Sequence, residues 1–385
     1  MRIGIDARMY GFASQGLGRY AEKLIESLSQ IDTKTLYHIF VMRGTRVRAL
    51  PSNFKIVETS CKWYSFSEQL AWPFQLYREK LDLMHFTHFN VPVAYLRPYV
   101  VTVHDLILLR FPTTHASTRH PLFFRLKYLA YRMVLRHAIK SAKAIIAVSG
   151  FTAQDIQRHF PGVRKKIKVI YEAPGVQPTS SADAIQYGND EAPYILYVGN
   201  AYPHKNLEYL TREFSVWQNS HPKHRLRLVG KRDYFYDRLA RTLNGSQSPV
   251  DILFDTTDSD LEQLYRRASA FVFPSLYEGF GLPALEAFAF NIPVLAADRG
   301  SLPEILGSAA LYFNPDVAED FRNKLSTILF DEELREKLRQ AGQIRYKKFS
   351  WAATALETRA LYGELQNEYN RAVPVNSYVQ KKRTK

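Results

Sequence analysis

Two glutamates in one short segment are the residues of this sequence best placed to do chemistry. Glu278 and Glu286 enclose the stretch Gly-Phe-Gly-Leu-Pro-Ala-Leu, so seven residues separate them. A buried strand is predicted to end shortly before this segment, and its proline favours the first turn of a helix. Free N–H groups at such a helix start bind anions. We therefore expect an anion site formed by the backbone of Gly279, Phe280, Gly281 and Leu282.

The two carboxylates themselves have two interpretations. Glu286 is expected about one turn inside the helix, where a carboxylate that accepts two hydrogen bonds suits a vicinal diol such as a ribose. The alternative is that both glutamates only cap or flank an ordinary strand–helix turn. The glycine-bearing loop between strand and helix favours the first interpretation.

A histidine and two lysines follow other predicted strands. His104 comes directly after the apolar run at 99–103, where its ring could accept a proton, or could be satisfied by neighbours at a strand end. Asp105 could fix that ring or cap the following helix. Lys205 stands at the start of a predicted helix, so its charge adds to the positive helix dipole. Lys231 follows the next strand and could assist Lys205 or be a solvated surface lysine.

Short apolar runs alternate with helical segments along the whole chain, a pattern typical of βαβ units with parallel sheets. We expect strands near residues 2–6, 37–42, 54–58, 81–86, 99–103, 144–148, 167–171, 194–199, 225–229, 250–254, 270–274, 292–296 and 309–313. Two such sets predict an α/β protein with two doubly wound, Rossmann-like domains. Their facing edges would form a deep cleft at the carboxyl ends of the strands, where the residues above should lie.

Domain boundaries follow from the same pattern. Residues 1–175 form the expected first domain, and the Pro-, Gly- and Ser-containing stretch 176–193 is a natural linker. The second domain spans 194–350. A long helix at 351–370 is expected to return to the first domain, and 371–385 form a basic tail.

Charge is distributed unevenly over the 385 residues. The formal net charge is +15, and all of this excess lies in residues 1–175, which favours an acidic partner for the first half. No apolar run is long enough to span a bilayer, and the N-terminus lacks a signal-peptide pattern, so we expect a cytoplasmic protein. The single cysteine, Cys61, excludes a disulfide framework, and no set of residues has metal-ligand spacing.

The segment from Glu278 to Glu286 resembles the E-x7-E signature of retaining nucleotide-sugar glycosyltransferases of the GT-B fold, family 4 (group 1). The likeness runs nearly end to end and is greatest to the bacterial mannosyltransferase branch of O-antigen and exopolysaccharide assembly. It rests also on Asp6-Ala-Arg-Met with Gly16-Leu-Gly-Arg-Tyr20, Thr102-Val-His-Asp-Leu106, Tyr197-Val-Gly-Asn with His204-Lys-Asn-Leu207, and Leu302-Pro-Glu-Ile305.

The resemblance implies roles at the matching positions. Glu286 would hold the nucleotide ribose, and Glu278 with the amides of the glycine loop would meet the donor sugar and its phosphates. Lys205 would pair with the diphosphate, and His104 would contact the donor sugar. A family arginine is replaced by Asn200, so diphosphate binding would depend more on Lys205 and Lys231. Asn291 replaces a family glycine, which a left-handed helix end tolerates.

The first domain would supply the remaining contacts. The glycine loop with Gly16 and Gly18 would approach the donor phosphates or the acceptor. Arg19, Tyr20 and Asp105 would lie on the acceptor side.

A basic amphipathic segment at 120–143 is typical of a helix that lies on a membrane surface. Its expected lipid contacts are Arg125, Lys127, Arg132 and Arg136. The alternative is a covering helix with a solvated charged face. The basic run at 164–168 is interpreted in the same two ways.

Together these features predict a retaining hexosyltransferase that needs neither a metal nor a cofactor. Its donor would be a nucleotide diphosphate sugar, with GDP-mannose the best candidate. Its acceptor would be a glycan on a polyprenyl diphosphate at the inner membrane surface, in surface polysaccharide synthesis. The alternatives are a catalytically silent GT-B scaffold, a basic nucleic-acid-binding protein, or a nucleotide-sugar epimerase; the sequence contains no nucleic-acid-binding motif.

Overall fold

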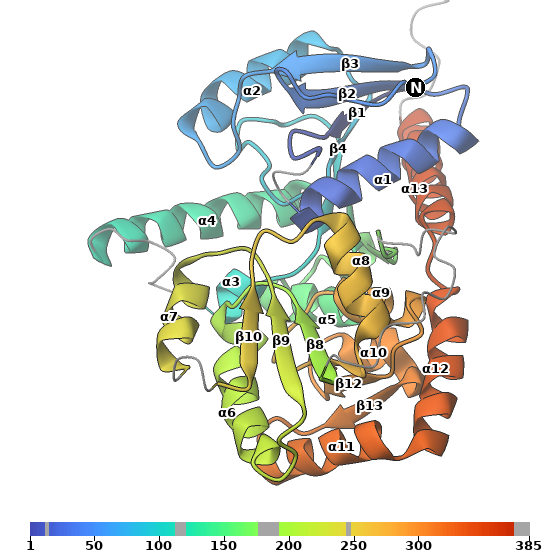
Figure 1. The fold of residues 1–385 in the computed structure, drawn as a ribbon. Coiled ribbons are helices and arrows are strands. Elements are labelled where there is room, and N and C mark those ends of the chain that lie inside the picture. The colour runs from blue at the N-terminus through green and yellow to red at the C-terminus, as the bar shows by residue number, and fades with distance from the viewer. Residues whose placement is uncertain (12–14, 112–120, 176–191, 244–247, 373–385) are drawn as a thin grey trace, which may run out of the picture.

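The computed structural model describes residues 1–11, 15–111, 121–175, 192–243 and 248–372. Figure 1 shows two α/β domains, one above the other, and each is built on a parallel sheet. The expected linker at 176–193 and the basic tail at 371–385 lie almost entirely outside the described residues.

Within the described part of the first half, seven parallel strands form one sheet in the order β3-β2-β1-β4-β5-β6-β7. The strands are β1 (Arg2–Asp6), β2 (Leu36–Met42), β3 (Phe54–Thr59), β4 (Leu83–Phe86), β5 (Tyr99–Val103), β6 (Ala144–Ala147) and β7 (Ile167–Val169). The expected strands therefore form, although β4 begins two residues later than predicted and β7 ends two residues earlier.

Helices cover both faces of this sheet. The side chains of α2 (Phe66–Arg78), α4 (Pro121–Ser141) and α5 (Gly150–His159) pack in one core cluster. The opposite cluster contains α1 (Gln15–Ile31) and, from the far end of the chain, α13 (Trp351–Ala372). The short helix α3 (Ile107–Arg110) follows β5, and the 3-10 turn η3 (Arg164–Lys166) precedes β7.

The second sheet has, among the described residues, six parallel strands in the order β10-β9-β8-β11-β12-β13. They are β8 (Tyr194–Val198), β9 (Arg225–Val229), β10 (Val250–Leu253), β11 (Ala270–Phe273), β12 (Val294–Ala297) and β13 (Ala310–Phe313). Its helices are α6 (Leu207–Gln218), α7 (Tyr234–Thr242), α8 (Asp258–Arg267), α9 (Leu282–Ala289), α10 (Leu302–Leu306), α11 (Ala318–Phe330) and α12 (Glu332–Tyr346), with 3-10 turns η4 (Pro203–Lys205) and η6 (Gly307–Ala309).

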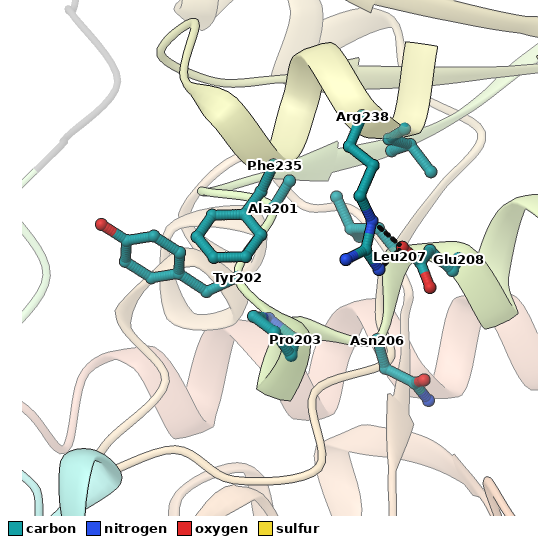
Figure 2. A pocket seen from close by; sticks show the side chains of 9 residues that line it. Ala201, Tyr202, Pro203, Asn206, Leu207, Glu208, Phe235 and Arg238 are labelled. Carbon is teal, nitrogen blue, oxygen red and sulfur yellow. Dashed lines mark hydrogen bonds and ion pairs between the residues drawn. The ribbon is translucent and has the colours of Figure 1, made fainter. Parts of the chain in front are cut away.

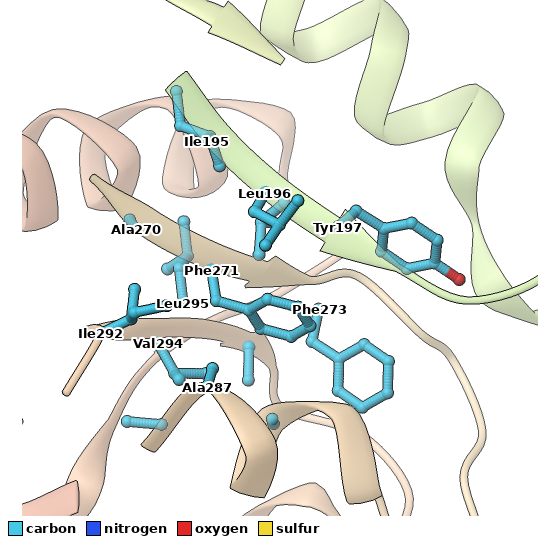
Figure 3. Close-up of a cluster of buried hydrophobic side chains, with 14 of the residues drawn as sticks. Ile195, Leu196, Tyr197, Ala270, Phe271, Phe273, Ala287, Ile292, Val294 and Leu295 are labelled. Atoms are coloured by element: carbon cyan, nitrogen blue, oxygen red, sulfur yellow. The ribbon is translucent and has the colours of Figure 1, made fainter. Parts of the chain in front are cut away.

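The central strands of the second sheet are buried on both faces, which is why they consist of continuous apolar residues rather than an alternating pattern. Figure 3 shows Leu196, Phe271 and Leu295 from three adjacent strands packed together beside Ala287 of α9. This core fixes the strand ends, and the strand ends hold the loops that carry the site residues.

Local sequence signals explain several helix starts. Ser149 caps α5 by accepting a hydrogen bond from the Thr152 amide. Thr257 and Asp260 form a reciprocal capping box at α8. Each cap satisfies N–H groups that a helix start otherwise leaves unpaired.

The chain's last described helix returns to the first domain. The α13 residues Ala355, Leu361 and Tyr362 are buried in the same core as α1 and β1. Tyr362 Oη lies 2.6 Å from His85 Nδ1 of β4, and Arg359 Nε donates to Asp32 Oδ2 over 3.1 Å. The first domain is therefore completed by a segment from the other end of the sequence.

Candidate active site

A lysine and a glutamate from two neighbouring loops meet at the end of the second sheet. Lys205 ends the turn η4 after β8, and Glu278 lies in the loop after β11. Lys205 Nζ donates to Glu278 Oε1 over 2.6 Å. Their side chains are only 13% and 10% exposed, respectively. The strands β8 and β11 are adjacent at the point where strand order reverses, which is where doubly wound folds bind ligands.

The loop after Glu278 needs glycines at two positions. A Cβ on Gly279 would lie 1.8 Å from the carbonyl oxygen of His104, so only glycine lets this loop approach the first domain so closely. Gly281 has a φ of +108° and stands just before α9. No side chain among the described residues caps this helix start. The loop with Phe280 and Leu282 therefore leads into α9 with its first amides uncapped, as an anion site requires.

Glu286 lies in the second turn of α9 and faces hydrogen-bond donors. Arg19 Nη1 donates to one carboxylate oxygen over 3.3 Å, and Tyr265 Oη donates to the other over 3.3 Å. Arg19 is the residue that was expected on the acceptor side. Its long side chain spans the two domains and pairs with the glutamate expected to hold the ribose.

The ring of His104 is held by two partners of the first domain. Nε2 donates to the Thr87 carbonyl over 2.9 Å, and Nδ1 donates to Glu172 Oε1 over 2.8 Å. Burial disfavours the imidazolium, but the Glu172 carboxylate and both hydrogen bonds outweigh burial and raise the pKa of His104. Both ring nitrogens of His104 are therefore engaged by first-domain partners, so neither is free to take a proton from an acceptor in this arrangement.

Two residues expected on the acceptor side, Tyr20 and Asp105, lie beside His104. Tyr20, expected on the acceptor side, is fully buried, packs edge-on against the His104 ring and shares a hydrogen bond with Thr102. Asp105 Oδ1 accepts from the Ile107 amide at the start of α3, so it caps the helix and does not fix the ring. Burial raises the pKa of Asp105.

The two glycines of the first-domain motif lie in a helix rather than a loop. Gly16 and Gly18 both fall in the first turn of α1, while residues 12–14 lie outside the described residues. The predicted loop therefore ends earlier than expected: the apolar periodicity of α1 begins at Leu17, and the helix starts two residues before it. Gly16 is exposed and Gly18 is buried.

Two further expected donor contacts lie at the carboxyl edge of the second sheet. Asn200, after β8, holds its own turn: its side-chain oxygen accepts from the Tyr202 amide. Lys231 follows β9 and is exposed. Within the described part of the chain, neither residue hydrogen-bonds to Lys205 or Glu278.

Polar contacts join the glutamate loop to helix α5 of the first domain. Ser149 and Thr152 both donate to the Gly279 carbonyl, over 2.6 and 3.2 Å. Tyr277 Oη donates to the buried Asp155 over 2.6 Å and accepts from the Leu106 amide over 3.2 Å. The position of Glu278 is therefore set by both domains.

A second contact couples the domains at the start of α5. The two carboxylate oxygens of Glu304 accept from the amides of Gly150 and Phe151, each over 2.7 Å. A carboxylate at a helix start satisfies free N–H groups and interacts favourably with the helix dipole. Glu304, in the Leu-Pro-Glu-Ile motif, thus acts as an N-terminal cap supplied from the opposite domain.

Sequence reasoning missed Glu172, Asp155 and Tyr265 as parts of this arrangement. Glu172 lies three residues beyond the end of β7, so the rule that functional residues follow strands would have included it. Asp155 lies within α5 and Tyr265 within α8, and nothing in their local sequence indicates a partner in another element.

A small cavity of about 90 Å³ lies on the outer side of the Lys205 loop. Figure 2 shows Tyr202, Pro203, Phe235 and Asn206 around it, with Arg238 paired to Glu208 at its edge. A pocket for a drug-sized ligand is roughly 300–1,000 Å³. This cavity is therefore too small to be the donor site and reflects packing between the loop and α7.

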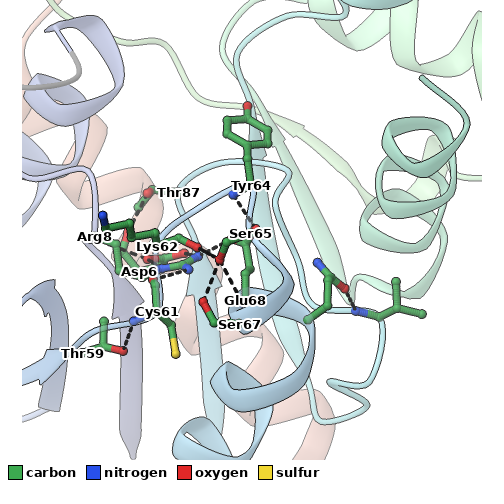
Figure 4. Close-up of polar contacts among 12 residues, drawn as sticks. Asp6, Arg8, Thr59, Cys61, Lys62, Tyr64, Ser65, Ser67, Glu68 and Thr87 are labelled. Atoms are coloured by element: carbon green, nitrogen blue, oxygen red, sulfur yellow. Dashed lines mark hydrogen bonds and ion pairs between the residues drawn. The ribbon is translucent and has the colours of Figure 1, made fainter. Parts of the chain in front are cut away.

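A buried ion cluster stands directly after β1. Arg8 donates to Asp6 and to Glu68 of α2, over 2.7 and 2.8 Å, and to the Cys61 carbonyl over 3.2 Å (Figure 4). Its guanidinium lies 4.4 Å from the Trp72 ring centroid. An arginine has five N–H donors in a rigid planar group, so it can bond several acceptors at once. The cluster ties the end of β1 to α2.

The expected membrane residues lie on α4. Arg125, Lys127, Arg132 and Arg136 are all exposed, and His120 falls outside the described residues. Among the described residues, no helix is long and apolar enough to cross a membrane. Within that same part of the chain, no cluster of three or more His, Cys, Asp or Glu could hold a metal ion.

Two Rossmann-like domains that face each other across loops bearing a lysine, paired glutamates and an uncapped helix start define the GT-B class of proteins. Residues 182–345 match the family described as glycosyl transferases group 1, and residues 16–173 match glycosyltransferase family 4. The chain belongs to these glycosyltransferases, as its motifs predict.

Two curated relatives match most of the chain. The chain is 28% identical over 340 residues to the O-antigen chain mannosyltransferase RfbU of Salmonella typhimurium, covering 84% of this chain and 90% of the relative. It is 29% identical over 301 residues to O-antigen chain mannosyltransferase B of Escherichia coli, covering 76% of each chain. These relatives are mannosyltransferases of O-antigen chains.

Solved structures confirm the fold. Sucrose-phosphate synthase of Thermosynechococcus elongatus matches with a TM-score of 0.73 and 21% identity, over 96% of this chain and all of that one. WaaG, a glycosyltransferase involved in lipopolysaccharide biosynthesis, matches with a TM-score of 0.68 and 16% identity, over 92% and 98%. At these identities the likeness concerns the fold alone.

Proposed function

We propose that this protein transfers a hexose from a nucleotide diphosphate sugar to a glycan acceptor with retention of the anomeric configuration. The observation that carries the proposal is the buried Lys205–Glu278 contact at the point where strand order reverses. A lysine held there by a carboxylate is ready to exchange that partner for a diphosphate, whose charge is larger. Glu286, in the second turn of α9, is placed to accept from ribose hydroxyls in exchange for Arg19 and Tyr265.

Catalysis in this proposal consists of positioning and charge stabilisation. The diphosphate gains negative charge as its bond to the sugar breaks, and Lys205 with the amides at the start of α9 stabilises that charge. His104, held in place by Thr87 and Glu172, orients the sugar. Because both ring nitrogens of His104 are already bonded to Glu172 and Thr87, we assign the proton of the acceptor hydroxyl to the departing phosphate oxygen. Leaving group and acceptor then lie on the same face of the sugar, which retains configuration.

The donor we favour is GDP-mannose, because the relatives named above are O-antigen mannosyltransferases. The acceptor we favour is a growing glycan on a polyprenyl diphosphate in surface polysaccharide synthesis. Such an acceptor lies at an anionic membrane surface, to which the exposed basic residues of α4 would attach the protein as a peripheral one. The net charge of +15, all carried by the first half, suits that location.

The reaction is expected to need no divalent metal, because Lys205 and the helix-start amides supply the counter-charge to the diphosphate. Full activity in excess EDTA is the expected result. Loss of activity in EDTA, with recovery on addition of Mg²⁺ or Mn²⁺, would contradict this part of the proposal.

The decisive experiment compares donors. Slow hydrolysis and thermal stabilisation are measured with GDP-mannose, UDP-glucose, UDP-N-acetylglucosamine and dTDP-rhamnose, and NMR identifies the anomer of any product. We expect GDP-mannose to be bound and cleaved, with the α-anomer formed first. Binding without cleavage would indicate a silent scaffold, and conversion of one nucleotide sugar to another would indicate an epimerase.

A matched variant tests the ribose contact. Glu286→Ala should weaken binding of the free nucleotide diphosphate in calorimetry, while circular dichroism shows an intact fold. Unchanged affinity would mean that Glu286 serves only to hold Arg19 and Tyr265.

A further inference from the structure

The outward face of α2 carries an apolar ridge that the protein itself does not cover. Phe66, Leu70 and Phe74 stand at i, i+4 and i+8, so they form one line along the helix. They are 89%, 68% and 71% exposed. Single exposed apolar residues are ordinary on protein surfaces, but a continuous line of three large ones is not.

The ridge is not the face that packs α2 onto the sheet, because α2 has a separate buried face. Trp72 and Leu76 are fully buried on the side toward the sheet, and Glu68 is buried in the Arg8 cluster. Helix α2 is therefore apolar on two opposite sides, and only one of them is used in folding.

The apolar surface continues from α2 toward α4. The connecting segment 91–97 is joined to α2 by hydrogen bonds from the Val93 amide to Gln69 and from Tyr77 to the Ala94 carbonyl. Leu96, in the same segment, is 79% exposed. Helices α2 and α4 pack on the same face of the first sheet, where their inward residues share one core cluster. In Figure 1 both helices lie on the same side of the first domain.

Helix α4 adds both apolar and basic side chains to this surface. Leu126, Leu129 and Met133 are each more than half exposed, and they alternate along the helix with Arg125, Lys127, Arg132 and Arg136, which are exposed too. Across α2, α4 and the segment 91–97, the only acidic residue is the buried Glu68. The surface thus combines large apolar groups with positive charge.

We infer that the α2 ridge of Phe66, Leu70 and Phe74 inserts into the outer layer of an anionic lipid bilayer while the α4 cations bind its headgroups. An anionic bilayer matches both features, because its headgroups attract lysine and arginine and its acyl region accepts apolar side chains. A second copy of the chain matches less well, since the centres of protein interfaces are depleted of charge. This inference rests on the proposed membrane location and adds a second contact to it.

The insertion has a geometric consequence for the proposed reaction. The ridge lies on the first domain, and Arg8 and Glu68 connect α2 to the end of β1 at the carboxyl edge of the sheet. A bilayer seated on α2 and α4 would therefore keep this domain at the surface where a lipid-linked acceptor lies. The second domain carries Lys205 and Glu278 and would remain free of the lipid.

Vesicle flotation with phosphatidylglycerol-containing vesicles tests the inference, using the triple variant Phe66→Ser, Leu70→Ser and Phe74→Ser. Fully burying one such side chain changes a partition constant by roughly tenfold or more. We expect the variant to lose about 100-fold in partition while hydrolysing GDP-mannose at the wild-type rate. The matched control Ile344→Ser with Leu356→Ser removes two exposed aliphatic residues elsewhere and should bind vesicles normally.

A fluorescent label on the ridge distinguishes insertion of the ridge into the bilayer from electrostatic binding of the protein to the vesicle surface. In a Cys61→Ser background, Leu70→Cys is labelled with a polarity-sensitive fluorophore, and Ile344→Cys serves as the control site. Anionic vesicles should shift the emission at position 70 to the blue and leave position 344 unchanged. The quadruple change of Arg125, Lys127, Arg132 and Arg136 to Gln should abolish binding to vesicles at low salt.

Each other outcome overturns the inference in a recognisable way. If the quadruple variant loses vesicle binding while the ridge variant keeps it, α4 docks alone and the ridge does not insert. If wild type hydrolyses GDP-mannose but binds no vesicles, the enzymatic proposal stands and the lipid surface is wrong. If the ridge variant converts a dimer to a monomer in ultracentrifugation and keeps vesicle binding, the ridge is an interface between two copies.

Discussion

Tyr277 of the second domain donates its phenolic hydrogen to the buried Asp155 of the first domain over 2.6 Å, and Glu278 is the next residue in the chain. Arg110 pairs with the same carboxylate, so Asp155 is held on both sides. The main chain that carries a central site glutamate is therefore tied to the opposite domain at the preceding side chain. The Tyr277 hydroxyl therefore links the position of Glu278 to the contact between the two domains.

Removing that hydroxyl should lower activity more than stability. Tyr277→Phe leaves the Leu106 amide without its acceptor and loosens the loop of Glu278. We expect kcat/KM for donor hydrolysis to fall about tenfold, equivalent to a loss of roughly 1.4 kcal/mol of transition-state stabilisation. The matched control is Tyr312→Phe, which removes a hydroxyl bonded to the Gly307 carbonyl inside the second domain. Equal kinetic losses in both variants would argue against a special role for Tyr277.

Glu304→Ala should uncouple the start of α5 from the second domain. The change removes the acceptor of the Gly150 and Phe151 amides, and hydrogen bonds to a charged group are worth about 1.5–3 kcal/mol. Amide hydrogen exchange at Gly150 and Phe151 should become about ten- to 100-fold faster. In the control Asp331→Ala, which removes the cap of α12 within one domain, exchange at these two amides should not change.

Glu172→Gln should lower the pKa of His104, because it removes the carboxylate that offsets burial. In wild type the pKa of His104 is raised by folding, so its stabilising contribution is complete below about pH 6.5 and is lost as pH rises through the folded pKa. The alkaline limb of the kcat/KM profile should move to lower pH in the variant. NMR titration of the His104 ring provides a direct check. An unshifted limb would mean that the charge of His104 plays no part in turnover.

Lys205→Ala should reduce kcat by about 100-fold or more, the scale for loss of a preorganised charge-stabilising group. Lys205→Arg should recover only part of this rate, because a planar fork does not replace a point charge. Lys231→Ala is the internal control, since this exposed lysine does not join the Glu278 contact. If Lys231→Ala has the larger effect on kcat, the diphosphate is held at the end of β9 instead.

Arg8→Met should cost about 3–5 kcal/mol in the free energy of unfolding, because it leaves the carboxylates of Asp6 and Glu68 buried without a cation. Urea denaturation should show a lower midpoint with an unchanged slope. The loss should be smaller at pH 5 than at pH 7.5, since burial raises the pKa of Glu68 and its protonation relieves one of the two charges. The triple variant with Asp6→Asn and Glu68→Gln should regain part of the stability. A stable Arg8→Met at pH 7.5 would show that water reaches the cluster.

The order of strands and the strand–loop–helix form of the glutamate segment were predictable because they depend on local signals. Apolar runs mark the parallel strands, and Gly281 with Pro283 marks the loop and the start of α9. The partners of the site residues were not predictable in the same way. Glu172 lies 68 positions beyond His104, and Arg19 lies 267 before Glu286, so their pairing depends on how the domains meet.

The ridge on α2 shows a second limit of sequence reasoning. Phe66, Leu70 and Phe74 have the spacing of a core stripe, and so do the residues around Trp72 on the other side of the helix. Periodicity indicates that a helix is amphipathic but does not say which apolar side faces the sheet. Only the packing of Trp72 and Leu76 against the sheet identifies the ridge as the outer side.

The return of α13 to the first domain affects the order in which the protein can be completed during synthesis. The first sheet is translated early, yet one of its two core clusters contains Ala355, Leu361 and Tyr362 from the other end of the chain. Domains usually fold one after another as the ribosome delivers them. Here the N-terminal half is synthesised first, and the apolar surface that α13 later covers stays exposed until α13 has been made. The apolar side chains of β1 and α1 therefore remain partly exposed while about two hundred further residues are translated.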